Sequence, residues 1–126
     1  MKLQSLVDTS RNALTGYGPG FLEVNRARYT HPLLVMPARP VQAWPVPDVS
    51  ALDAAAFESL LALEPELVLL GTGERQRFVH PRLYAALSGR RIGVEMMDTG
   101  AACRTYNILM SEGRQVLAAL FAPAAG

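Results

Sequence analysis

The sequence predicts an α/β fold built on a parallel strand–helix–strand unit, with an antiparallel hairpin before it and one more strand after it. Two apolar runs of strand length, Leu67–Leu70 and Ile92–Val94, flank a helix-length segment that Pro81 and Gly89 delimit. A glycine-rich turn cluster precedes this unit, and an apolar run, Val116–Phe121, follows it. Together these observations favour an α/β domain over an all-helical or all-β one.

Length and composition predict one globular domain spanning residues 1–126. A chain of 126 residues can bury roughly two-thirds of the surface that its unfolded form exposes. Hydrophobic residues make up 50% of the chain and charged residues 18%, which argues against disorder over most of its length. We expect frayed ends only at 1–12 and 123–126.

Charge and cysteine content limit the classes of partner and compartment. The formal net charge is +1, so no global field attracts nucleic acid or anionic lipid, and we expect no nucleic-acid partner. Cys103 is the only cysteine, which excludes an intrachain disulfide and fits a reducing compartment. No apolar stretch reaches the roughly 18 residues that span a bilayer, and the N-terminus lacks a signal-peptide core. These features predict a cytoplasmic protein without a transmembrane segment.

The N-terminal third is predicted to be an antiparallel meander. A turn cluster of Gly16, Gly18, Pro19 and Gly20 leads into Phe21–Val24, which begins a hairpin. Asn25 and Arg26 form a second tight turn, because Asn tolerates left-handed backbone angles. Residues 27–36 then return as a strand that is interrupted near His31 and Pro32.

Four prolines between residues 37 and 47 confine any strand there to an edge, because proline cannot donate to a central sheet ladder. We predict a short edge strand at Val41–Trp44, with Trp44 covering the margin of the core. A proline-rich recognition segment is the alternative.

Helix signals appear twice in the middle of the chain. Ser50 and Asp53 resemble a capping box for a helix over about 51–63, which ends before Pro65. A second, short helix starts with Pro81 in its first turn and closes at Gly89. The run Leu67–Leu70 is apolar without alternation, as in a strand covered on both faces, and we place it at the sheet centre. The alternating residues 92–96 predict a second interior strand.

A longer helix follows the second strand. Asp98 or Thr99 is well suited to cap it. Its buried stripe is predicted from helical spacing and comprises Ala102, Thr105, Tyr106, Leu109 and Met110. The final apolar run, Val116–Phe121, lies between Gly113 and Pro123, and so few residues favour a strand over a helix.

The turn Gly71–Arg75 is the first candidate site. It follows an interior strand, where α/β proteins place ligands, and the exposed amides of such a turn, formed by Gly71, Thr72 and Gly73, can bind an anion. The segment contains neither a complete phosphate-binding loop nor a dinucleotide fingerprint. A ligand cradle and a plain tight turn therefore remain alternatives, and the tight turn is favoured.

An acidic cluster at the next strand end is the second candidate. Glu95, Asp98 and Thr99 lie close together in sequence, and Arg104 can supply a counter-charge one helical turn on. Paired carboxylates can perform acid–base work if one is desolvated. Helix capping and a structural Arg–carboxylate contact explain the same residues without chemistry, and this interpretation is favoured, so no catalytic residue is assigned.

Metal and nucleophile chemistry receive no support. His31 and His80 each precede a proline and have no Cys or carboxylate at metal-ligand spacing. Cys103 falls inside a helical pattern without a positioned base, which predicts a packed thiol. We therefore expect no metal and no cofactor.

Several short segments carry a resemblance to a known family. These are Gly71–Gly73, Gly93–Glu95, Asp98–Thr99, Ala102–Cys103, Thr105–Asn107 and Glu112–Arg114. They resemble the small-domain family of mitochondrial complex I (NADH:ubiquinone oxidoreductase) assembly factor 3 and its uncharacterised bacterial relatives. The resemblance implies a compact three-layer α/β domain with a mixed β-sheet, in which the final strand runs antiparallel to its neighbours.

For function, the resemblance implies a non-enzymatic binding or assembly protein with a protein partner. Its implied surface centres on Gly71, Gly73, Glu95, Asp98, Thr99 and Asn107. We add the exposed part of the 71–75 turn and the polar helix face that bears Arg104 and Asn107. The chain lacks the targeting extension of the mitochondrial form, which predicts a bacterial cytoplasm.

A small-ligand-binding protein or weak enzyme is the alternative, with its site at the 71–75 turn and the 95–99 acidic cluster. The shape of the surface discriminates between the two hypotheses. A deep pocket around Glu95 and Asp98 would favour the alternative, and a flat face would favour the assembly protein.

Overall fold

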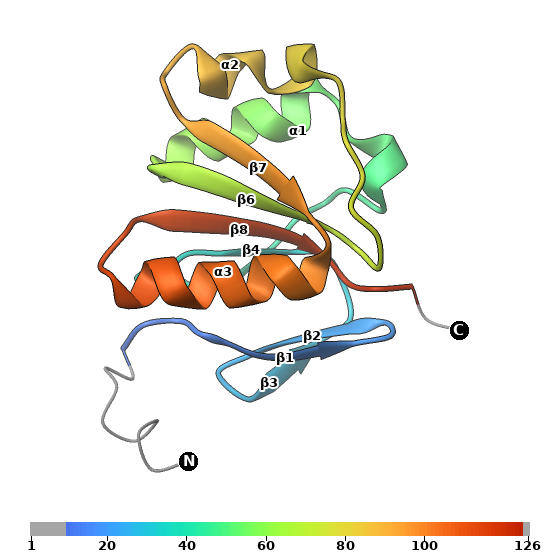
Figure 1. The fold of residues 1–126 in the computed structure, drawn as a ribbon, viewed down its shortest axis with the longest axis vertical. Coiled ribbons are helices and arrows are strands. Elements are labelled where there is room, and N and C mark those ends of the chain that lie inside the picture. The colour runs from blue at the N-terminus through green and yellow to red at the C-terminus, as the bar shows by residue number, and fades with distance from the viewer. Residues whose placement is uncertain (1–9, 125–126) are drawn as a thin grey trace.

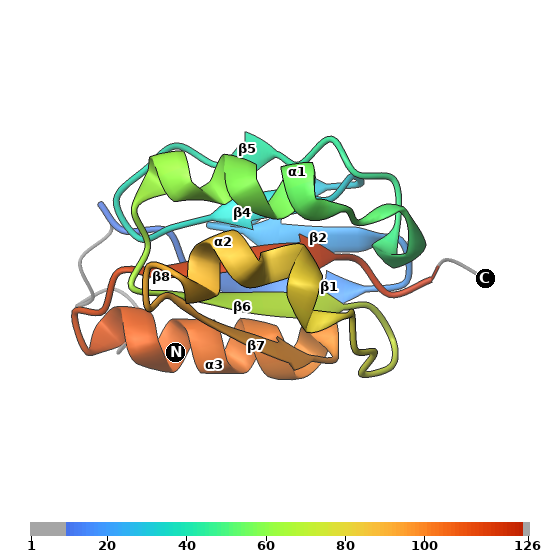
Figure 2. The same cartoon turned by 90° about the horizontal axis from the view of Figure 1, so that it is seen from above.

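The computed structural model describes residues 10–124, which form two β-sheets with helices on both faces of the larger one (Figure 1). A three-stranded antiparallel sheet has the order β1-β2-β3, and a five-stranded mixed sheet has the order β5-β4-β8-β6-β7. Figure 2 shows α1 and α3 on opposite sides of the larger sheet. The predicted three-layer α/β domain with a mixed sheet is confirmed.

Short strands and helices make up most of the described residues. The strands are β1 Leu14–Gly18, β2 Phe21–Val24, β3 Ala27–Tyr29, β4 Leu33–Val35, β5 Gln42–Ala43, β6 Leu67–Thr72, β7 Gly93–Met97 and β8 Val116–Phe121. The α-helices are α1 Ala54–Glu58, α2 Ala85–Ser88 and α3 Thr99–Ser111, and the 3-10 helices are η2 Val49–Ala51, η3 Ser59–Leu63 and η4 Pro81–Tyr84.

The N-terminal hairpin forms as predicted, and its turns use left-handed backbone. Gly20 has φ 78°, and Asn25 and Arg26 have φ 51° and 71°. The predicted return strand over 27–36 is divided, because β3 stays in the small sheet whereas β4 pairs antiparallel with β8 in the large one. Pro32, which has no backbone N–H to donate, lies at the point where the chain crosses between the sheets.

β6 and β7 are parallel neighbours, in register from Leu67↔Gly93 to Gly71↔Met97, as predicted. The predicted direction of β8 was wrong with respect to β6. β8 runs parallel to β6 and antiparallel to β4. The cause is α3, which acts as a second crossover helix and returns the chain in the direction of β7.

The order of strands also differs from the prediction. β8 is buried along its whole length and occupies the middle of the sheet, between β4 and β6. β7 lies at an edge, where Gly93 and Glu95 are exposed, so its assignment as an interior strand was wrong. β6 is an interior strand beside the centre, and its apolar run is covered on both faces as predicted.

Each face of the large sheet has its own core. Val68 and Leu70 of β6 join the cluster under α1 and α2, whereas Leu69 points into the cluster under α3 and the small sheet. This alternation follows from the two-residue period of a strand. The two clusters explain why the strand sequences are apolar without a polar face.

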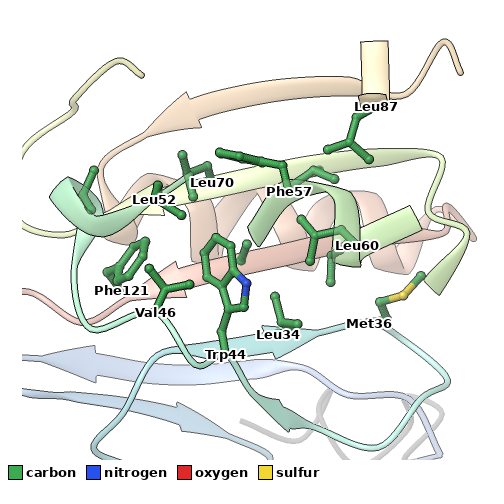
Figure 3. Close-up of a cluster of buried hydrophobic side chains, with 14 residues drawn as sticks. Leu34, Met36, Trp44, Val46, Leu52, Phe57, Leu60, Leu70, Leu87 and Phe121 are labelled. Carbon is green, nitrogen blue, oxygen red and sulfur yellow. The ribbon is translucent and has the colours of Figure 1, made fainter. Parts of the chain in front are cut away.

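Trp44 lies deeper than the predicted core margin. It follows the edge strand β5, which forms as predicted but spans only two residues. Trp44 is buried among the side chains of the α1 face (Figure 3), with its ring centroid 5.3 Å from that of Phe121 and 6.4 Å from that of Phe57. The proline-rich segment thus supplies a large core side chain.

The first predicted helix begins later than expected. Asp53 is the N-cap of α1, where it adopts extended backbone and its carboxylate accepts from the Ala56 N–H at 2.9 Å. Ser50 belongs instead to η2, and its hydroxyl donates to Asp48. The predicted Ser50 cap was therefore wrong, because the extended Asp53 separates η2 from α1. The end before Pro65 is confirmed, with Glu64 at φ 51°.

The described parts of both chain ends are attached to the fold. The Asn12 side chain donates to the carbonyls of Met36 and Arg39, and Arg11 donates to the carbonyl of Met110. The Pro123 carbonyl accepts from the Gly20 N–H at 2.8 Å. The rest of the two segments expected to fray lies outside the described residues.

Candidate functional site

Asp98 caps α3, as predicted. Its backbone is extended, and its carboxylate accepts from the Ala101 N–H at 2.9 Å. This bond satisfies one of the amides that a helix leaves unpaired at its start. Asp98 is thereby assigned a structural role at the carboxyl end of β7.

Thr99 is fully buried and connects three elements. Its hydroxyl accepts from the Gly73 N–H at 2.7 Å and donates to the Phe121 carbonyl at 2.5 Å, while its own N–H donates to the Gly73 carbonyl. These bonds join α3 to the turn after β6 and to the end of β8. Thr99 is a cross-link rather than the cap, and Asp98 alone has the capping role.

Backbone conformation and close packing require the glycines of the 71–75 turn. Gly73 has φ 95°, which side chains rarely tolerate. A Cβ on Gly71 would lie 2.8 Å from Leu120 and 3.2 Å from the Cβ of Ala102, so Gly71 allows α3 and β6 to approach closely. Both glycines are explained by the fold, which supports the tight-turn interpretation.

Thr72 holds the start of the loop that follows. Its hydroxyl lies 2.5 Å from the Arg75 carbonyl and 3.2 Å from the Met97 carbonyl, and it accepts from the Arg77 N–H at 3.0 Å. The side chain is buried. Thr72 therefore pins the loop backbone, whereas the Arg75 side chain itself remains exposed.

Asn107 is engaged in a paired contact with the first strand. Its amide donates to the Leu14 carbonyl at 2.8 Å and its carbonyl oxygen accepts from the Leu14 N–H at 2.9 Å. The side chain thus extends the pairing of β1 in the manner of a neighbouring strand. Asn107 fixes α3 to the small sheet instead of presenting its amide to solvent.

Arg104 and Glu95 are exposed, but they do not form the predicted pair. In the described part of the chain, Arg104 has no ion pair with Glu95 or Asp98. Its guanidinium donates instead to the hydroxyl of Tyr17 at 3.0 Å. The expected counter-charge was therefore wrong, because α3 directs Arg104 toward β1 rather than β7.

A cleft of about 450 Å³ opens at the carboxyl ends of β6 and β8. Five segments far apart in sequence line it: Gly20, Thr30–Pro32, Pro47–Val49, Thr72–Arg77 without Gln76, and Phe121–Ala124. Among the predicted site residues it includes Thr72, Gly73 and Arg75. The other predicted residues lie outside its lining, namely Gly71, Glu95, Asp98, Thr99, Arg104 and Asn107.

The cleft contains charged residues that the sequence analysis did not single out as a site. Asp48 and Arg77 line it together with His31. The pKa of the Asp48 carboxyl is lowered, mainly by the Ser50 hydroxyl and with a smaller effect of Arg77. Sheet topology is the feature that could have located this site. Because β8 is parallel to β6, a ligand site is expected where the carboxyl ends of both strands meet.

Cys103 is a packed thiol, as predicted. It lies on the side of α3 that packs into the core, and burial raises its pKa to about 12. A thiol with this pKa is protonated at neutral pH and is a poor nucleophile.

Within residues 10–124, no group of three or more His, Cys, Asp or Glu side chains is arranged to hold a metal ion. The same described residues include no helix long and apolar enough to cross a membrane.

Comparison with known proteins identifies the family. Residues 14–121 match the family described as "Protein of unknown function (DUF498/DUF598)". The chain belongs to this family. It is 38% identical over 109 residues to bovine NADH dehydrogenase [ubiquinone] 1 alpha subcomplex assembly factor 3, a match that covers 85% of this chain and 58% of the bovine protein. The resemblance to the assembly-factor family is thus confirmed.

Solved structures of bacterial relatives share the fold of this DUF498 chain. A crystal structure of a Bordetella parapertussis protein is 43% identical, has a TM-score of 0.85, and covers 92% of this chain and 99% of that chain. A solution structure from Bordetella pertussis, described as a Mth938-like domain, is 35% identical with a TM-score of 0.84, and covers 95% and 91%. The overall fold is therefore shared with these two relatives.

Proposed function

We propose that this DUF498 chain is a non-enzymatic, assembly-factor-like protein that binds a protein partner in the formation of a respiratory complex I. The observation that supports it is the 38% identity to the bovine assembly factor over 85% of the chain. The match covers 58% of the length of that relative. A role in complex I assembly is therefore proposed for this chain.

The proposed partner surface comprises the exposed part of the 71–75 turn and the exposed Arg104 on α3. Arg75 and Arg104 are exposed, so a partner can reach both without disturbing a core. Asn107, Asp98 and Thr99 serve this surface indirectly, because their hydrogen bonds to backbone groups fix the elements that carry it. Arginine suits such a surface because its guanidinium can bind carboxylates through two hydrogen bonds.

The alternative, a small-ligand site joining the turn to the acidic cluster, gains no support. The cleft is bordered by the turn, but Glu95 and Asp98 do not line it. Asp98 is engaged in capping and Glu95 is exposed at the sheet edge. Neither of these two carboxylates is therefore placed in the cleft for acid–base work. Cytoplasmic residence in a bacterium is part of our proposal.

Deleting the gene in its native host tests the proposed function. Native electrophoresis of respiratory complexes should then show less complete NADH dehydrogenase and more of its partial assemblies. A tagged copy should restore the pattern and recover subunits of that complex, identified by mass spectrometry. An unchanged pattern together with no recovered subunit would refute the proposal.

Charge reversal provides a matched comparison at the proposed surface. Arg75→Glu should weaken recovery of the partner, whereas Arg90→Glu should not. Both arginines are exposed, but Arg75 follows the carboxyl end of β6 and Arg90 precedes the amino end of the parallel strand β7. The two substitutions thus make the same change of charge at opposite ends of the parallel strands.

A further inference from the structure

The loop between β6 and η4 exposes a large aromatic side chain. Phe78 has an exposed fraction of 75%, compared with 59% for Ile108 and 41% for Tyr17, the other exposed large hydrophobic residues in the described part of the chain. A single exposed apolar residue is ordinary on a protein surface. Three features around Phe78 indicate a binding surface: an anchored backbone, basic charge and an adjoining cleft.

The backbone on both sides of Phe78 is anchored. The Arg77 N–H donates to the buried Thr72 hydroxyl at 3.0 Å, and the Val79 N–H points to the Met96 sulfur at 3.4 Å. Gln76 adds a side-chain bond to the Met96 carbonyl at 2.9 Å. Because the loop is held by these contacts, a partner that binds Phe78 has less loop entropy to remove.

The charge around Phe78 is predominantly basic. Arg75, Arg77 and Arg82 are exposed in the same segment, against one carboxylate, Glu74. Among the described residues, none of the three guanidinium groups forms an ion pair within 4.0 Å. Asp48, across the cleft, interacts with Arg77 only weakly and at longer range. The segment therefore has unpaired positive charge to offer an acidic partner.

The 450 Å³ cleft begins where this basic segment begins. Arg75 and Arg77 line the cleft, and its walls also include Pro32, Val49 and Phe121. Asp48 and Glu74 also line the cleft, so its lining is mixed, and its apolar residues and two arginines suit a peptide side chain flanked by carboxylates. Phe78 follows Arg77 directly, so the cleft and the aromatic anchor adjoin along the chain.

We propose that residues 74–82 and the adjoining cleft dock an extended segment of a protein partner that carries an apolar residue flanked by Asp or Glu. The carboxylates bind Arg75 and Arg77, and the apolar residue buries Phe78. This inference rests on the proposed function and specifies the chemistry of its partner. Aromatic and arginine side chains are the residues that most often dominate the energy of such interfaces.

An anionic membrane surface is a different occupant with the same charge. The anchored loop offers it one aromatic side chain, and single insertions of this size give weak, reversible attachment. A flat lipid surface also makes no use of a cleft. The combination of cleft, arginines and one aromatic anchor therefore favours a protein segment.

Selection from a random dodecapeptide display library tests the inference on the full chain. Wild-type protein should enrich peptides in which Asp or Glu flanks an aliphatic or aromatic residue. The synthesised consensus peptide, measured by fluorescence anisotropy, should bind Phe78→Ala and Arg77→Glu at least about tenfold more weakly. Ile108→Ala and Arg90→Glu are the matched controls, and they should bind the peptide like wild type.

Unfolding curves accompany every variant, and those of Phe78→Ala and Arg77→Glu should match wild type because both side chains are exposed. Equal peptide affinity of Phe78→Ala and wild type, or selected peptides without acidic residues, would overturn the inference. Phe78-dependent binding to phosphatidylserine–phosphatidylcholine vesicles without any peptide binding would overturn it in favour of a membrane surface.

Complementation of the gene deletion separates this inference from the proposed function. If deletion impairs complex assembly and Phe78→Ala restores it fully, the docking surface is refuted and the assembly role stands. If deletion leaves the assembly pattern unchanged and the tagged copy recovers no subunit, but the consensus peptide binds through Phe78, the docking surface stands and the assembly role is refuted.

Discussion

Helix α3 with its N-cap Asp98 and the loop after β6 both contain polar residues but use them in opposite ways. In α3, Asp98, Thr99 and Asn107 bind backbone groups of other residues. In the loop, Arg75 and Arg77 send their side chains outward, and the backbone is held by the neighbouring Thr72. The sequence predicts a single partner surface that includes parts of both regions.

The difference shows that nearby unpaired backbone groups decide the role of a short polar side chain. A helix start, a strand end and a tight turn meet around Thr99, and each leaves amides or carbonyls that must be paired when buried. Short side chains such as Asp, Thr and Asn reach those groups. Long arginine side chains on the loop extend past them and remain available to a partner.

Removing the Thr99 hydroxyl should have the largest effect on stability. Thr99→Val keeps the shape but leaves the Gly73 N–H and the Phe121 carbonyl without this buried partner. We expect a loss of about 2–4 kcal/mol in the free energy of unfolding, measured by denaturant titration. Thr105→Val on the same helix is the control and should cost under about 1 kcal/mol. Equal losses for the two variants would show that the cross-link is unimportant.

Asn107→Ala should have the next largest effect. It removes both bonds to Leu14 and so loosens β1 from α3. We expect the free energy of unfolding to fall by about 1–3 kcal/mol, since the site is partly buried and water can replace some of the pairing. Hydrogen exchange at the Leu14 amide should accelerate in the variant. Unchanged protection of that amide would contradict this role.

Asp98→Ala should cost about 0.5–2 kcal/mol, the usual range for loss of an N-cap. Asp98→Asn is the informative control, because Asn also caps well and should retain most of the stability. Thermal or denaturant unfolding of both variants measures the difference. A large loss of partner recovery by the stable Asn variant would instead transfer Asp98 to the binding surface.

The fold was predictable from local patterns, except where two distant segments had to be placed relative to each other. Apolar runs and turn residues located β6, β7, α3 and β8 along the chain, and capping chemistry located the start of α3. Strand direction in the sheet depends on α3 acting as a crossover and on which strands β8 pairs with, and no local pattern specifies those partners. That is why the predicted antiparallel relation of β8 to its neighbours failed for β6.

Of the residues that line the cleft, only those of the 71–75 turn were predicted from the sequence. Thr72, Gly73 and Arg75 follow a recognisable strand, whereas His31, Asp48 and Arg77 reach the cleft from loops that carry no shared motif. The sequence also did not indicate that Phe78 is exposed, because an apolar residue between a strand and a helix is usually expected in the core.

Charge reversal at Arg75 and Arg104, the two arginines of the proposed partner surface, should have the smallest effect on stability. Arg75→Glu and Arg104→Glu should each change the free energy of unfolding by less than about 1 kcal/mol, because neither guanidinium has a buried partner and the Arg104 contact with Tyr17 is exposed. Partner recovery in pull-downs should separate them. The docking loop contains Arg75, so Arg75→Glu should reduce recovery more than Arg104→Glu does. Equal, full recovery by both would refute the partner surface. Equal, strong loss would extend it from the loop across the start of α3, which would erase the contrast between the two regions.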